Sequence, residues 1–134
     1  MTILLAYDGK PNSEKALNYA IRHAVNYSEP LYIATIVSKD QMDPEDPDES
    51  VREYMEAAQR KAALEGATVH TIIEVGKADE MVINVADLYK CDTIIVGRSG
   101  RSSLDRLFLG SVSNYVVKNA DCTVIVVSDE REED

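Results

Sequence analysis

The segment from Gly97 to Ser111, GRSGRSSLDRLFLGS, contains three glycines, three arginines and four serines. It follows a short apolar run and precedes a stretch of helical spacing, and glycine at such a junction lets the backbone approach a phosphate without obstruction. The N–H groups at the start of the following helix favour an anion. The three arginines, against Asp105 alone, give the segment a formal charge of +2, which attracts polyphosphate. The segment is therefore a candidate phosphate-binding loop, although glycines after a strand and a Gly-Ser helix start are also ordinary turn and cap chemistry.

Several other phosphate-handling motifs are absent from the sequence. Neither the G-x-x-x-x-G-K-[ST] loop nor the G-x-G-x-x-G dinucleotide fingerprint occurs in the chain. A phosphoacceptor receiver domain needs an acidic pair after the first strand, an aspartate ending the third and a lysine after the fifth. The segments YDGK, EVGK and VVSDE do not supply that set. An ATP pyrophosphatase needs a Ser-Gly-Gly loop after the first strand, and DGKPNS is not that loop.

The elements that must position this loop follow from hydrophobic periodicity. Five short apolar runs predict strands: Ile3 to Tyr7, Leu31 to Val37, Thr68 to Val75, Thr93 to Val96 and Thr123 to Val127. Four stretches of helical spacing separate them: one after DGKPNS, where Asn12 or Ser13 can cap, then 49–65, 78–89 and a last one from Ser111. Runs that are apolar on both faces are typical of parallel strands covered by helices on each side. The sequence therefore predicts a three-layer, doubly wound α/β domain.

In such a sheet, ligands bind beyond the carboxyl ends of the strands, where the strand order reverses. The loops leaving the first and fourth strands, YDGKPNS and the Gly97 to Ser111 segment, are expected to open at that crevice. Ser111 and Ser113 can add hydroxyl donors there. The residues of these two loops are suited to binding a nucleotide.

Charge is distributed unevenly along the chain. The net charge is −10, but seven acidic residues lie between Asp40 and Glu53 and five between Asp129 and Asp134. We expect residues 40–50 to form a mobile acidic loop and residues 129–134 an acidic tail. The remaining body is formally neutral and has no basic face, so general binding to nucleic acid is disfavoured.

Cysteine, histidine and hydropathy patterns give further expectations. Cys91 and Cys122 form no C-x-x-C pair, so a structural zinc site is disfavoured, and both are interpreted as small hydrophobes rather than redox-active residues. His23 and His70 fall on a helix and an edge strand, away from the strand ends. No apolar run approaches the roughly 20 residues that cross a bilayer, and the N-terminus lacks a secretory signal pattern. We expect a cytoplasmic protein with no membrane association.

The last predicted strand, Thr123 to Val127, is apolar on both faces although it is expected at a sheet edge. An exposed edge of this kind pairs with another chain unless it is covered. The acidic tail is too short to cover it. The sequence therefore predicts a homodimer through this strand.

Taken together, the motifs resemble those of one family. Gly97, Gly100 and Gly110-Ser111 match the G-x2-G-x9-G-[ST] signature of ATP-binding members of the universal stress protein family. ILLAYDGKPNSEKALNYA is similar to that family's first strand, Asp-Gly turn and first helix, and GKADEMVINVA, CDTIIVG and GSVSNYVVKNADCTVIVV resemble its later elements. The similarity covers the chain except around residues 40–50. Lys10, Arg98-Ser99 and Thr123 depart from the residues usual in the family at those positions.

The resemblance implies a single domain over residues 1–128 with a five-stranded sheet of order 3-2-1-4-5, the adenine nucleotide alpha hydrolase-like fold. It implies a homodimer through the fifth strand and ATP, with or without Mg²⁺, in the crevice. The implied nucleotide contacts are Asp8 and Ile36 at the adenine and ribose, the backbone of Gly97, Arg98 and Gly100 at the ribose and phosphates, and Gly110, Ser111, Val112 and Ser113 at the phosphates. Asp8 could equally be a turn residue, and Ile36 could equally belong to the core.

The resulting functional hypothesis is an ATP-binding regulatory protein of the stress response. Hydrolysis would need a base, a positioned water and charge neutralisation. Asp8 and Asp105 are candidate metal ligands, but no histidine or glutamate has an evident claim to be the base, so no catalytic residue is predicted. The alternative is a slow ATPase or phosphoryl-transfer enzyme that uses the same pocket.

Overall fold

The computed structural model describes residues 1–39, 46–98 and 110–128, and within them five strands and four helices. In chain order these are β1 (Ile3–Ala6), α1 (Pro11–Tyr27), β2 (Leu31–Val37), α2 (Glu49–Leu64), β3 (Val69–Val75), α3 (Ala78–Leu88), β4 (Thr93–Gly97), α4 (Ser111–Asn119) and β5 (Thr123–Val127). The predicted alternation of strands and helices is confirmed. The predicted acidic tail, and residues 40–45 of the predicted acidic loop, lie outside the described residues. Glu49 and Ser50, at the end of that loop, already belong to α2.

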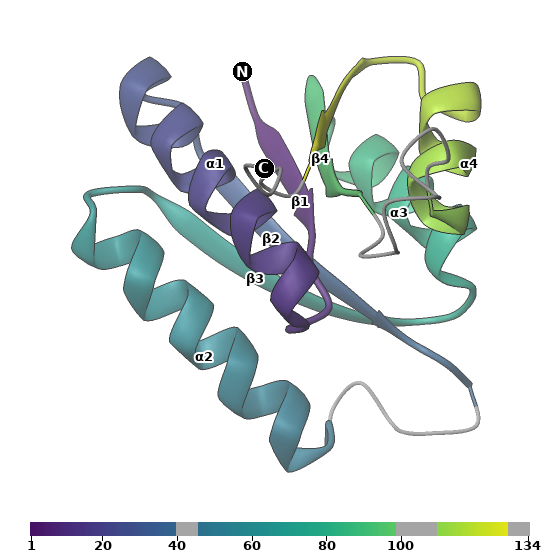
Figure 1. Cartoon of the computed structure of the whole chain (residues 1–134), viewed down its shortest axis with the longest axis horizontal. Coiled ribbons are helices and arrows are strands. Elements are labelled where there is room, and N and C mark those ends of the chain that lie inside the picture. The colour runs from purple at the N-terminus through teal and green to yellow at the C-terminus, as the bar shows by residue number, and fades with distance from the viewer. Residues whose placement is uncertain (40–45, 99–109, 129–134) are drawn as a thin grey trace, which may run out of the picture.

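The five strands form one sheet of order β3-β2-β1-β4-β5 (Figure 1). Every neighbouring pair is parallel, and β1 lies at the centre with Ile3 opposite both Leu31 of β2 and Thr93 of β4. The strand order and the α/β class are therefore confirmed. The order reverses between β1 and β4, which makes the carboxyl ends of these two strands the switch point of the sheet.

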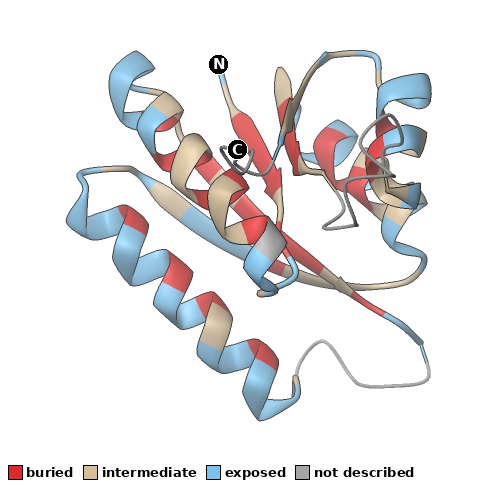
Figure 2. Cartoon of the chain, in the orientation of Figure 1, coloured by how far each residue is buried: buried red, intermediate tan, exposed pale blue. Residues whose placement is uncertain are grey.

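Helices cover both faces of the sheet and create two separate cores (Figures 1 and 2). Alternate residues of β1 explain this, because Ile3 and Leu5 pack toward α1 and α2 while Leu4 packs toward α3 and α4. All three side chains are fully buried. A strand that is apolar on both faces thus forms the middle layer of a three-layer domain.

The helix ends agree with the sequence in one place and differ in another. Asp48 caps α2, since its side chain accepts a hydrogen bond from the Ser50 N–H, and Gly66 follows the helix with a φ of +94°, as expected of a C-terminal glycine. The prediction that Asn12 or Ser13 caps α1 is wrong. The helix begins earlier, at Pro11 with Lys10 in the N-cap position, because proline is preorganised for the first helical turn.

The edge strand β5 is only partly buried. In β5, Thr123 is exposed and the four residues after it are only half-buried, although Ile125 and Val127 pack into one core and Val124 and Val126 into the other. This is the edge through which the sequence predicts a homodimer.

None of the described helices has the length and hydropathy needed to span a membrane.

Candidate functional site

A cavity of about 150 Å³ lies at the carboxyl ends of β1, β2 and β4. The starts of α3 and α4 close its other side. Its lining residues are Ala6, Tyr7, Asp8, Ser13, Ala34, Thr35, Ile36, Ala78, Val82, Val96, Gly97, Val112 and Ser113. The walls are mainly apolar. The polar lining residues come from four places: Asp8 from the turn after β1, Ser13 from the start of α1, Thr35 from β2 and Ser113 from the start of α4.

The turn after β1 is held by Asp8. Its Oδ1 accepts hydrogen bonds from the Lys10 N–H at 2.9 Å and from the Ser13 hydroxyl at 2.8 Å. Gly9 has a φ of +76°, a conformation that favours glycine. Asp8 is therefore a turn residue that also lies in the cavity wall, and its contact with a nucleotide stays a prediction.

The start of α4 forms the opposite side of the cavity. Gly110 is its N-cap, in extended conformation, and no side chain within the described residues caps this helix end. The first N–H groups of a helix have no partner inside the helix and carry a partial positive charge. The Ser113 hydroxyl donates to the Gly97 carbonyl at 3.1 Å, which ties α4 to the end of β4. This arrangement favours an anion beside Gly110.

Two tyrosines, Tyr7 and Tyr54, lie next to the turn. The Tyr54 hydroxyl from α2 lies 2.6 Å from the Thr35 hydroxyl, and the Tyr7 hydroxyl donates to a carboxylate oxygen of Glu14. Burial raises the pKa of both phenols, and the negative charge of Asp8 adds to the effect. Both side chains are therefore neutral hydrogen-bonding groups at physiological pH.

The structure brings together much of the predicted site. Asp8, Ile36, Gly97, Val112 and Ser113 line this one cavity. Ile36 also packs against the core beneath α3 and α4, and its contact with a nucleotide stays a prediction.

Gly110 and Ser111 open α4 beside the cavity. The Arg98 N–H donates to the Val127 carbonyl at 2.9 Å, so this amide belongs to the sheet. Gly100 and Asp105 lie outside the described residues.

Sequence reasoning missed Ser13 and Thr35 as members of the cavity wall. Thr35 is only 2% exposed, and it is a hydroxyl residue near the carboxyl end of the apolar run LYIATIV. A polar residue at that point of a buried strand was a usable signal. Ser13 follows Asp8 by five residues, and its contact with Asp8 depends on where α1 begins.

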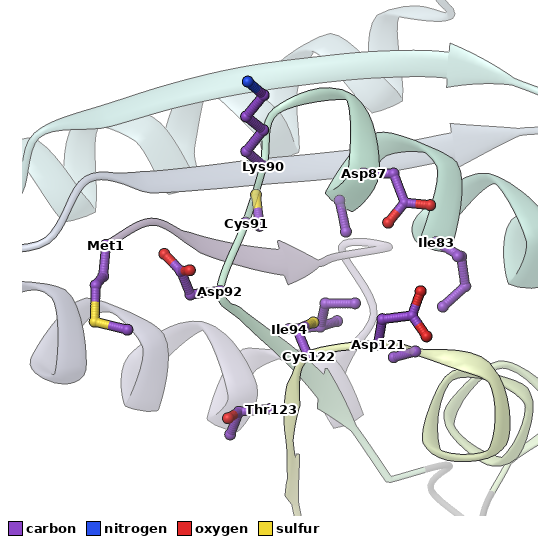
Figure 3. Close-up of a pocket in the computed structure, with 12 residues that line it drawn as sticks. Met1, Ile83, Asp87, Lys90, Cys91, Asp92, Ile94, Asp121, Cys122 and Thr123 are labelled. Atoms are coloured by element: carbon purple, nitrogen blue, oxygen red, sulfur yellow. The ribbon is translucent and has the colours of Figure 1, made fainter.

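A second, larger hollow of about 700 Å³ lies at the amino ends of β1, β4 and β5 (Figure 3). Asp87, Asp92, Asp121 and the thiols of Cys91 and Cys122 are among its lining residues. Both cysteines are free and pack into one core, as the sequence predicts for small hydrophobes, and burial raises the pKa of the Cys91 thiol to about 11. No group of three or more metal-ligating side chains is found within the described ranges.

The fold and the first cavity together define a class: a doubly wound α/β domain with an anion-favouring crevice at its switch point. Comparison with known proteins then gives the family. The model of the universal stress protein family matches residues 1–128, and the chain belongs to that family.

Two relatives match this chain over most of their length. A universal stress protein of Methanocaldococcus jannaschii is 28% identical, with 98% of this chain and 84% of that protein covered. Universal stress protein A homolog 2 of Coxiella burnetii is 32% identical, over 83% of this chain and 71% of that protein. A universal stress protein crystallised in complex with cAMP superposes with a TM-score of 0.77 at 25% identity, over 95% of each chain.

Proposed function

We propose that the protein binds ATP in the cavity at the carboxyl ends of β1, β2 and β4 and acts as a regulatory protein of the stress response. One observation carries the proposal. The cavity lies at the switch point of the sheet and is bordered by the start of α4, at Gly110-Ser111, which is the end of the G-x2-G-x9-G-S sequence. The complex of a structural neighbour with cAMP supports an adenine nucleotide as the ligand.

The cavity wall suits the two halves of a nucleotide. Ala34, Ile36 and Val82 offer an apolar surface on which a base can be buried. The backbone N–H groups at the start of α4 offer donors and partial positive charge for phosphates, whereas the Ser113 hydroxyl already donates to the Gly97 carbonyl. We therefore assign the adenine and ribose to the Asp8 and Ile36 side, and the phosphates to Gly110, Ser111, Val112 and Ser113.

The proposed role is regulation because the cavity supplies binding groups rather than a set of reacting groups. Among the described residues, its titratable wall residues are Asp8 and Tyr7, and Asp8 Oδ1 is engaged by the turn while Tyr7 stays protonated. A ligand that prefers one conformation shifts the population toward it and stabilises the folded chain. The fraction of the protein in the nucleotide-bound conformation would thus follow the concentration of ATP. We further propose that the protein works in the cytoplasm as a homodimer joined through β5.

Co-purification tests the proposal directly. Protein purified without added ligand is denatured, and the released small molecules are separated by chromatography. We expect an adenine nucleotide to be recovered, and we expect ATP to raise the melting temperature of the nucleotide-free protein, with and without Mg²⁺ compared. A clean extract together with no thermal shift at millimolar ATP would contradict the proposal.

The same preparation distinguishes regulation from enzymatic turnover. Release of inorganic phosphate from ATP is followed with the pure protein and with a Ser111→Asp variant. The regulatory role predicts no turnover above the background of the variant. Turnover that the substitution abolishes would instead establish the slow ATPase.

A further inference from the structure

Tyr54 of α2 contacts the turn that borders the cavity. A Cβ atom built on Gly9 would lie 2.5 Å from the Cγ and Cδ2 atoms of Tyr54, so the aromatic ring rests directly on the glycine. The same ring packs edge-on against Tyr7, with centroids 5.7 Å apart and planes at 79°. The turn therefore has the Asp8 hydrogen bonds inside it and a flat aromatic ring against Gly9.

The hydroxyl of Tyr54 reaches a second wall of the same cavity. It lies 2.6 Å from the Thr35 hydroxyl, and Thr35 is a buried residue of β2 that lines the cavity. One side chain of α2 thus touches the turn after β1 through its ring and the end of β2 through its oxygen. Neither wall can move away from the other without disturbing Tyr54.

Other contacts of α2 are core packing and a partly exposed ion pair. Its buried residues are Val51, Met55, Ala58 and Ala62, which pack into the core beneath α1 and α2. Lys61 lies 3.7 Å from Glu14 of α1, but both side chains are more than two-fifths exposed, and such pairs contribute little. Met55, next to Tyr54 and 3% exposed, anchors the helix and is not a lining residue in the described part of the cavity wall.

We propose that Tyr54 is a positioning residue of the nucleotide site and that it couples occupation of the cavity to the docking of α2. The inference rests on the proposed function, since it concerns the same cavity. Coupling between two events is reciprocal. When Tyr54 contacts Gly9 and Thr35, it therefore strengthens nucleotide binding. In return, a bound nucleotide holds α2 more firmly on the sheet.

Three variants separate positioning from simple loss of stability. Tyr54→Ala removes the ring and the hydroxyl, Tyr54→Phe removes only the hydroxyl, and Met55→Ala loosens the same helix without touching Gly9. The dissociation constant of ATP is measured at a temperature where each variant is folded. We expect Tyr54→Ala to raise it at least about tenfold, Tyr54→Phe about threefold, as one weakened hydrogen bond would, and Met55→Ala less than about twofold.

Tyr54→Leu keeps an apolar side chain without the flat ring, and it replaces Tyr54→Ala if the latter does not fold. An ATP affinity that is equal in the Tyr54 and Met55 variants would overturn the inference while leaving ATP binding intact. Wild-type protein that fails to bind ATP would instead overturn the proposed function, and the inference with it.

Amide hydrogen exchange distinguishes a positioning role of Tyr54 from a general contribution to stability. The Lys10 N–H donates to Asp8 Oδ1, a hydrogen bond that we expect to slow its exchange with solvent. We expect Tyr54→Ala, and not Met55→Ala, to speed exchange at Lys10 in the absence of nucleotide. We also expect ATP to slow exchange of the α2 amides in the wild type but not in Tyr54→Ala. Unchanged Lys10 exchange in Tyr54→Ala would contradict the positioning role.

Discussion

The cavity at the carboxyl ends of the strands encloses about 150 Å³, whereas the hollow at the amino ends encloses about 700 Å³. In the part of the chain that the structure describes, the smaller one has one acidic side chain in its wall, Asp8, and adjoins the starts of α1, α3 and α4. The larger one has three, Asp87, Asp92 and Asp121, together with Lys90 and Met1, and adjoins the ends of α3 and α4. The two regions therefore differ in size and in which ends of the helices they adjoin.

The direction of the helices explains the difference. In a parallel α/β domain every helix starts near the carboxyl end of one strand and finishes near the amino end of the next, so partial positive charge gathers at one end and partial negative charge at the other. Acidic side chains at the amino end add to the negative field. Volume alone would favour the amino end for a phosphate ligand, whereas the orientation of the backbone favours the carboxyl end, where we propose that it binds.

The largest expected effect concerns the thiols at the amino-end hollow. Because the thiolate is the reactive form and burial raises the pKa of Cys91 to about 11, its thiolate fraction near pH 7 is at least roughly a hundredfold below that of a free thiol. We expect iodoacetamide to modify Cys91 correspondingly slowly in the native protein, with a rate that rises with pH toward 11.

The urea-unfolded protein is the control, and mass spectrometry of the peptide containing Cys91 is the measurement. Because the folded pKa is the higher one, the contribution of this thiol to stability is fully present below the unfolded pKa and is lost as pH rises toward 11. Rapid native alkylation at neutral pH would instead show a reactive site at the amino end.

A pair of glycines tests the turn at the carboxyl end. Gly9→Ala must place a methyl group 2.5 Å from the Tyr54 ring at a φ of +76°, whereas at Gly66, with a φ of +94°, nothing lies within 4 Å. We expect Gly9→Ala to lower the free energy of unfolding by about 2–3 kcal/mol and Gly66→Ala by about 1 kcal/mol. Urea unfolding measures both.

ATP binding sharpens that comparison. Only Gly9→Ala is expected to weaken it, because Gly66 ends α2 at a distance from the cavity lining. Equal effects of the two substitutions on stability and binding would mean that the Tyr54 contact does not matter to the site.

The smallest expected effect uses the two ends of α4. Ser111→Asp adds a negative charge at its first residue and Asn119→Asp adds one at its last, and both positions are exposed. The first should stabilise the fold and the second destabilise it, each by about 0.3–1 kcal/mol. ATP affinity should fall about tenfold with Ser111→Asp alone, because the added charge repels phosphate. Thermal unfolding and equilibrium dialysis separate the two readouts, and loss of affinity in both variants would argue against phosphates at the start of α4.

The sequence carries most of the fold and part of the site. Apolar runs on both faces predict buried parallel strands, and the carboxyl ends of neighbouring strands necessarily meet, which is why Asp8, Gly97 and Ser113 come together as expected. The spacing of Val51, Tyr54 and Met55 likewise shows which face of α2 turns to the sheet.

Two features could not be read from the sequence. Which loop Tyr54 reaches depends on how far α2 slides along the sheet, and that is set by packing across the core rather than by periodicity. The engagement of the Arg98 N–H by Val127 depends on β4 continuing to Gly97, one residue beyond the predicted strand.

An NMR titration of the ¹⁵N-labelled protein with ATP shows directly where the nucleotide binds. We expect chemical-shift changes at residues 8–13, at Gly97 and at residues 110–113, with residues 87–92 and 121–123 unchanged. Changes centred on the amino-end hollow, or no changes at millimolar ATP, would contradict it.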